Sequence, residues 1–188
     1  TVVPELPATT LADYCYHSMF YGCSSLTVVP ELPATTLAES CYQEMFEGCT
    51  GLTTAPSILP ATTLADSCYH SMFQGCTGLT TAPELPATTL VNACYQAMFA
   101  GCTSLTTAPE LPATTLASRC YYSMFSGCRS LTTAPELPAI TLTNVSVSLK
   151  SNLLIIIHSS VITIISQQKR INKLFLKHNI KKRCVICR

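Results

Sequence analysis

Apolar residues recur at every fourth position in a segment that the chain repeats. In the first copy this spacing gives two neighbouring rows, namely Leu11, Cys15, Met19 and Cys23, and beside them Ala12, Tyr16 and Phe20. Two adjacent rows with i, i+4 spacing form an apolar stripe that is typical of an amphipathic helix. The pattern therefore predicts a helix of about three turns in each copy.

Polar residues and glycines lie where such a helix would begin and end. Thr10 followed by Asp13 resembles a capping box. The same pair recurs as Thr36 with Glu39 and as Thr63 with Asp66. A glycine in the left-handed region commonly ends a helix, and one follows each predicted helix at Gly22, Gly48, Gly75, Gly101 and Gly127.

The other half of each copy has the composition of a short strand. The segment Leu79–Ala82 contains two threonines, which favour strands. Pro83 follows and has no N–H to donate to a sheet, so the strand must be brief. Alternation of one short strand with one short helix predicts a parallel sheet on one face of the protein and helices on the other.

The copies recur at a nearly constant period. Successive units begin, at intervals of 26, 26, 27, 26 and 26 residues, at Pro4, Pro30, Pro56, Pro83, Pro109 and Pro135. A period of this length indicates a stacked repeat architecture, in which each unit covers the apolar stripe of its neighbour. We predict an α/β fold, a right-handed solenoid of about five 26-residue repeats over residues 1–143.

Charge separates this repeat block from the end of the chain. Residues 1–139 contain two basic and ten acidic residues, a net charge of −8, whereas residues 140–188 contain nine basic and no acidic residues. The sixth unit stops matching the repeat after Thr143. We therefore place a boundary there and predict that residues 144–188 are not part of the solenoid. The chain begins at Thr1 without a signal peptide, so we interpret the block as N-terminally truncated.

Three interpretations of the tail remain open. It resembles the product of a reading-frame change, because the repeat residues disappear abruptly in favour of Ile, Lys, Asn and Ser. It also resembles a membrane anchor followed by positive charge, although Lys150, Asn152 and His158 interrupt the apolar stretch. A novel tail that covers the last repeat is the third interpretation.

Ten of the twelve cysteines belong to the repeat. Cys15 and Cys23 of one unit lie about 12 Å apart on a helix, beyond the roughly 7 Å Cα separation that a disulfide allows. Equivalent cysteines of neighbouring units could approach closely enough for a bridge. The alternative, which we favour, is a ladder of buried, reduced thiols that act as small apolar side chains. We expect no metal and no other cofactor.

The segments Met72–Leu79 and Met98–Leu105 carry an F-x-G-C-x-x-L core. This core resembles that of the BspA-type leucine-rich-repeat proteins of bacterial and some protist surfaces. The resemblance covers residues 1 to about 143. It implies a leucine-rich-repeat solenoid on a cell-surface or secreted protein, with adhesion or host-protein binding reported for some members, and it carries over no catalytic residues.

Two columns of repeated polar residues are the candidate ligand-facing positions, with a hydrated surface as the simpler alternative for each. The acidic column consists of Glu5, Glu31, Glu84, Glu110 and Glu136. The hydroxyl column consists of Thr54, Thr81, Thr107 and Thr133. His17 and His70 share one variable position, which we interpret as solvated, and we find no arrangement of residues suited to catalysis.

We therefore expect a non-catalytic binding or adhesion module whose partner is a host or cell-surface protein or glycan. The alternative is a structural spacer that displays another domain and has no ligand of its own. We expect no nucleic-acid partner, and membrane contact only through the tail.

Overall fold

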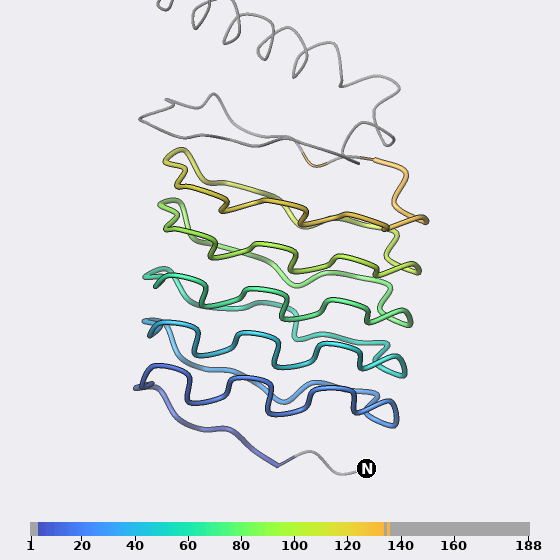
Figure 1. The fold of residues 1–188 in the computed structure, drawn as a ribbon, viewed down its shortest axis with the longest axis horizontal. Coiled ribbons are helices and arrows are strands. Elements are labelled where there is room, and N and C mark those ends of the chain that lie inside the picture. The colour runs from blue at the N-terminus through green and yellow to red at the C-terminus, as the bar shows by residue number, and fades with distance from the viewer. Residues whose placement is uncertain (1–3, 134, 136–188) are drawn as a thin grey trace, which may run out of the picture. The chain divides into compact units, whose positions relative to one another are not determined.

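The computed structural model describes residues 4–133 and 135, and these form a stack of coils (Figure 1). The coils follow the sequence period and comprise residues 4–29, 30–55, 56–82, 83–108 and 109–133. The chain divides into two units, Thr1–Ile156 and Ile157–Arg188, and every described residue belongs to the first. The predicted boundary after Thr143 lies outside the described residues.

The predicted helices are wrong. Within the described part of the chain there is no α-helix, and each predicted helix is replaced by ten residues of consecutive tight turns. We call these segments the turn runs. They comprise residues 13–22, 39–48, 66–75, 92–101 and 118–127.

Each turn run returns to the left-handed region of backbone space every fourth residue. In the third coil, Ser67, Ser71 and Gly75 have φ of 55°, 53° and 71°. The other four coils repeat this pattern, so ten non-glycine residues and five glycines have positive φ. The predicted left-handed glycines are confirmed, but they close the last of several turns and do not end a helix.

Backbone amides in a turn run alternate between two kinds of partner. The Met72 N–H donates to the Tyr69 carbonyl three residues back, at 3.3 Å. Its neighbour Phe73 donates to the Met98 carbonyl of the next coil, at 2.9 Å. This alternation satisfies the amides of the run while joining successive coils, and no α-helix could provide the second set of bonds.

The predicted parallel sheet is also wrong, and prolines explain why. The segments between turn runs, which we call linking runs, form isolated parallel bridges and no continuous strand in the described residues. These bridges join Val28 to Thr54, Thr36 to Thr63, Ile58 to Glu84, Thr81 to Thr107 and Thr89 to Thr115. Prolines such as Pro83 and Pro86 remove amide donors within each linking run, so the bonds between coils cannot extend into a continuous ladder.

Ladders of identical side chains fill the interior of the stack. Tyrosine rings of successive coils stack with centroids 5.7–6.0 Å apart and with planes within 9° of parallel. Phenylalanine rings form a second ladder with centroids 5.4–5.8 Å apart. Cys68, Met72 and Cys76 of the third coil are fully buried beside them. The apolar stripe predicted from the sequence therefore forms the core in the second to fifth coils, whereas in the first coil Cys15, Met19 and Cys23 are exposed.

The predicted capping boxes have a different role. The Asp13 carboxylate accepts a hydrogen bond from the Glu39 N–H of the next coil, at 3.0 Å. Asp66 accepts one from Asn92 N–H in the same way, at 3.1 Å. Because these contacts cross from one coil to the next, the aspartates help to hold neighbouring turn runs together and do not cap a helix of their own coil.

Candidate ligand-binding face

The linking runs form the side of the stack that lies behind the turn runs in Figure 1. Most of their leucines are buried, and most of their threonines are exposed. The hydroxyl column predicted from the sequence lies here, and all four of its members are exposed, namely Thr54, Thr81, Thr107 and Thr133. We call this column the first threonine row. Thr81 bridges directly to Thr107, and Val28 takes the place of threonine in the first coil.

A second threonine row lies at the other end of the linking runs and was missed at the sequence level. It consists of five exposed residues, Thr10, Thr36, Thr63, Thr89 and Thr115. Two bridges, Thr36 to Thr63 and Thr89 to Thr115, place its members directly beside one another. The repeated Pro-Ala-Thr-Thr sequence was a signal for this row, but we had interpreted its first copies as helix caps.

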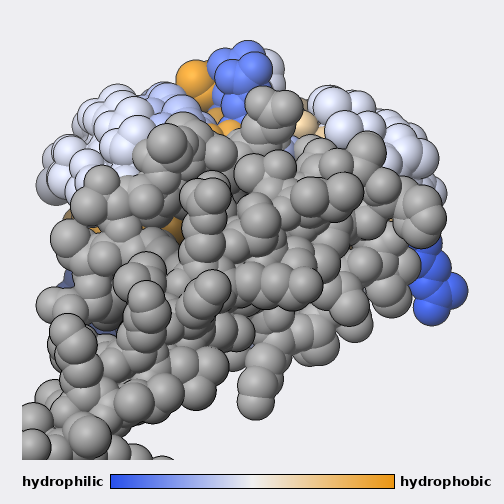
Figure 2. Space-filling view, turned by 90° about the horizontal axis from the view of Figure 1, so that it is seen from above, coloured by the Kyte–Doolittle hydropathy of each residue, from blue (hydrophilic) through white to orange (hydrophobic). Residues whose placement is uncertain are grey.

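The predicted acidic column lies between the two threonine rows along each linking run. Glu5, Glu31, Glu84 and Glu110 are exposed, whereas Glu136 lies outside the described residues. In the third coil Ser57 and Ile58 interrupt the column, and Ile58 bridges to Glu84. We refer to the two rows and this column together as the threonine face. Figure 2 views the stack along its length. The coloured residues at its edge have mostly intermediate hydropathy, with strongly hydrophilic and hydrophobic residues at a few points.

The polar groups of this face keep their hydrogen-bonding capacity. Among the described residues, the Thr81 and Thr107 hydroxyls and the Glu84 carboxylate form no side-chain hydrogen bond or ion pair. The adjacent threonines differ, since the Thr106 hydroxyl donates to the Thr80 carbonyl of the preceding coil, at 3.1 Å. One threonine of the pair therefore joins coils, and the other presents a hydroxyl to a ligand or to water.

A shallow hollow of about 330 Å³ lies at the start of the glutamate column. Its lining consists of Pro4, Glu5, Leu6, Pro7, Pro30, Glu31 and Pro33. Proline rings and two carboxylates make this surface partly apolar and partly acidic. The threonine face is thus not flat at its first two coils.

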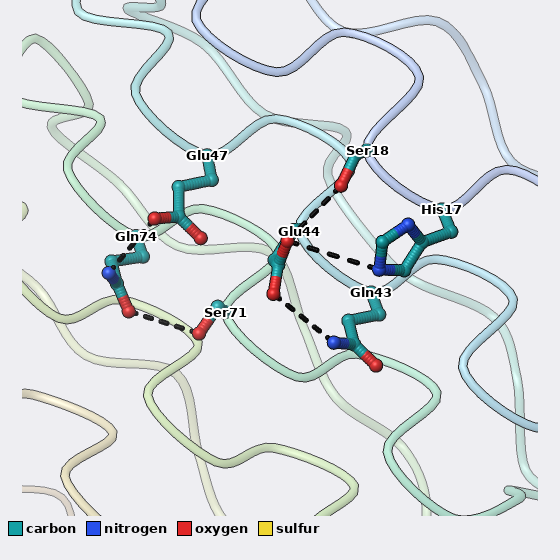
Figure 3. A network of polar contacts seen from close by, with 7 residues as sticks. All are labelled: His17, Ser18, Gln43, Glu44, Glu47, Ser71 and Gln74. Atoms are coloured by element: carbon teal, nitrogen blue, oxygen red, sulfur yellow. Dashed lines mark hydrogen bonds and ion pairs between the residues drawn. The ribbon is translucent and has the colours of Figure 1, made fainter. Parts of the chain in front are cut away.

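The turn runs carry a polar network instead of a ligand site (Figure 3). The Glu44 carboxylate accepts hydrogen bonds from Ser18 Oγ and Gln43 Nε2, each at 3.1 Å, and lies 3.9 Å from His17 Nε2. Similarly, Gln74 Nε2 donates to Glu47 Oε1 of the preceding coil, at 3.1 Å. Both oxygens of Glu44 are therefore engaged by the protein itself, and the network joins the first three coils.

Partial burial affects two ionisable groups in this region. Desolvation raises the pKa of Glu47, and the nearby negative charge of Glu44 adds to that effect. Desolvation also lowers the pKa of His70, although Glu44 opposes this change. His70 is half-buried, so our interpretation of its position as fully solvated was too simple, whereas its equivalent His17 is exposed.

The repeat cysteines are free thiols, and eight of the ten are buried. The Cys76 thiol donates to the Phe46 carbonyl of the preceding coil, at 3.1 Å. Burial raises the pKa of Cys41 to about 11 and that of Cys76 to about 12, so these thiols stay protonated and unreactive at neutral pH. The prediction of buried thiols fails only in the first coil, where Cys15 and Cys23 are exposed.

Two kinds of site are not found in the part of the chain that the structure describes. No group of three His, Cys, Asp or Glu side chains there is arranged to hold a metal ion. Nor does any helix among those residues have the length and apolar character needed to cross a membrane.

Comparison with known proteins gives no match: neither a family model, nor a curated protein, nor a solved structure is similar to this chain. The resemblance to BspA-type repeat proteins therefore stays a prediction that depends on the F-x-G-C-x-x-L motif.

Proposed function

We propose that the repeat block is a non-catalytic binding module, displayed at a cell surface or secreted, whose ligand contacts the threonine face. The observation that carries this proposal is the repetition of exposed, unengaged hydroxyls such as Thr81 and Thr107 at one position of successive coils. Many weak, identical contacts add up when a ligand spans several coils, so high affinity needs no deep pocket.

Substitution of the first threonine row tests this function. Valine keeps the size and strand preference of threonine but lacks the hydroxyl. Val28 shows that the row accepts valine. We expect a variant with Thr54→Val, Thr81→Val and Thr107→Val to fold normally and to lose binding to its target in a panel of immobilised extracellular-matrix proteins and polysaccharides.

The matched control is Gln96→Ala, which changes a half-buried residue of a turn run on the opposite side. It should bind as the wild-type protein does. If the wild-type protein binds no member of the panel, or if the valine variant binds equally well, the binding function is wrong.

A structural spacer is the second candidate, and the ladders favour it. Continuous stacks of tyrosine and phenylalanine rings, together with hydrogen bonds between all neighbouring turn runs, make a stack that resists bending. A spacer would retain this stiffness without any ligand. Absence of binding combined with normal folding would therefore favour the spacer.

A further inference from the structure

The ligand of the threonine face must repeat along the stack. Aromatic planes in successive coils deviate from parallel by no more than 9°, so successive coils have nearly the same orientation. The aromatic rings of successive coils are 5.4–6.0 Å apart, whereas backbone hydrogen bonds such as Thr106 N–H to the Thr80 carbonyl hold the linking runs near the spacing of neighbouring strands, about 4.8 Å. A straight ligand that meets the same groups at every coil must advance by this distance per unit.

The threonine face is more uniform than its structure requires. In the turn runs, the position of His17 is occupied by Gln43, His70, Gln96 and Tyr122 in the other coils. The equally exposed second threonine row is threonine in all five coils. Exposed positions carry little packing constraint, and Val28 shows that the first row does not need a hydroxyl to fold. Variation at this turn-run position and uniformity of the second threonine row therefore favour a role for the hydroxyls of that row, whereas Val28 and Ile58 interrupt the first row and the glutamate column.

Charge excludes anionic ligands. The face carries the carboxylates of Glu5, Glu31, Glu84 and Glu110. The basic residues among those described are Arg119, in a turn run, and Arg129, which is exposed two residues after the last turn run. Nucleic acids, acidic polysaccharides and anionic lipid surfaces would therefore meet net repulsion from the glutamate column.

Geometry and chemistry distinguish the remaining polymers. An extended polypeptide presents one face every second residue, at intervals of roughly 6.6 Å, which do not match the spacing of the coils. An extended chain of β-linked pyranose rings advances by one ring over a length close to that spacing, and because successive rings are turned over, the same hydroxyl groups return at every second coil. Threonine hydroxyls both donate and accept hydrogen bonds, and carboxylates accept from hydroxyl donors, so both suit sugar hydroxyls.

We propose that the threonine face binds a neutral, linear, β-linked polysaccharide that lies along the stack, with one sugar ring at each coil. This inference rests on the binding function proposed above. Row hydroxyls such as Thr81 and Thr107 exchange hydrogen bonds with the ring hydroxyls, and the glutamate column accepts hydrogen bonds from them. The threonine methyl groups pack against the C–H surface of the rings.

Calorimetry with cello-oligosaccharides of increasing length, together with co-sedimentation on insoluble cellulose, chitin and mannan, tests the inference on the full chain. We expect affinity to rise with oligosaccharide length, because each added ring reaches another coil. Thr81→Val with Thr107→Val should weaken binding about thirtyfold, since each of the two lost hydrogen bonds contributes about 1 kcal/mol. Thr81→Ser with Thr107→Ser, which keeps both hydroxyls, should retain most of the affinity, and Gln96→Ala should retain all of it.

Three results would overturn the inference. Equal binding by the valine variant would show that the hydroxyls are not used, and independence of chain length would show that the ligand does not follow the stack. Binding to a matrix protein through the threonine row, without binding to any of these polysaccharides, would overturn the polysaccharide ligand and leave the proposed binding function intact. Circular dichroism of each variant establishes that its fold is unchanged.

Discussion

Two positions in every turn run place a non-glycine residue in the left-handed region. Ala93 and Ala97, for example, both have φ of 52°. This conformation costs an L-residue with a side chain roughly 1–2 kcal/mol. A hydrogen bond to the next coil offsets this cost, because the left-handed conformation orients the amide toward that coil. Ala97 N–H, for example, donates to the Tyr122 carbonyl at 2.8 Å.

Ala97→Gly should therefore stabilise the protein. Glycine adopts positive φ without strain, and the gain exceeds the extra entropy of the unfolded chain, so we expect the free energy of unfolding to rise by roughly 0.5–1 kcal/mol. Thermal denaturation followed by circular dichroism measures the change. Ala100→Gly, in the same run but not at positive φ, is the matched control and should lower stability by a similar amount. Destabilisation by both changes would indicate a helix here.

Met72→Asp should be far more destabilising than His70→Asp. Met72 is fully buried, and a carboxylate there would lie without a partner in the apolar interior, which costs several kcal/mol. His70 is half-buried beside polar neighbours, so an acid at this position costs less. Equal losses in melting temperature for the two variants would show that the inward and outward sides of the turn run are assigned incorrectly.

At the scale of the element, a turn run is stable only beside another turn run. Its own hydrogen bonds join residues three apart and leave every second amide without a partner in the same coil. The buried thiols contribute to the same cohesion, since Cys102 and Cys128 donate to phenylalanine carbonyls of the preceding coil, each at 3.0 Å. The element therefore acquires its conformation through its neighbours and not from local propensity.

Thiol labelling should distinguish the first coil from the others. Cys15 and Cys23 are exposed and should react with N-ethylmaleimide in the folded protein, whereas Cys68 and Cys76 should react only after denaturation. Mass spectrometry of the peptides assigns each modification to its residue. Denaturation must be done without reductant, and if Cys68 still failed to react, disulfides and not free thiols would link the coils.

At the scale of the whole molecule, stability in such a stack comes mainly from contacts between adjacent coils. The tyrosine rings illustrate this, because Tyr69 stacks on Tyr42 and on Tyr95 at the same centroid distance of 5.7 Å. Each internal coil therefore presents nearly the same interface on both sides. The order of the coils should matter little.

Deletion of residues 83–108, which form one complete coil, should give a folded but less stable protein. The cut joins Ala82 to Pro109, preserves the period and allows Tyr121 to stack on Tyr69. Deletion of residues 96–108, half a coil, is the control and should prevent cooperative folding, because it destroys the alignment of the ladders. Near-ultraviolet circular dichroism follows the unfolding of both deletion variants, and a cooperative transition in each would contradict a stack held by aligned ladders.

The sequence by itself determined the repeat period, the inward-facing residues and the positive φ of the glycines. Leu64, Cys68, Met72 and Cys76 were assigned to one apolar row, and all four are buried. These features depend on residue type and spacing alone, since buried positions must be apolar in any fold that repeats them. The first threonine row followed in the same way from its strand-like composition.

Only the tertiary structure decided between helices and turns. An α-helix rotates about 40° beyond a full circle every four residues, so a row from Leu64 to Cys76 would drift around its surface, whereas turns of period four keep the row on one side. A row of four residues has only three such intervals, so the sequence pattern does not reveal this drift. The deciding bonds, such as Tyr69 N–H to the Cys94 carbonyl, join residues in different coils, and a local pattern contains no record of them.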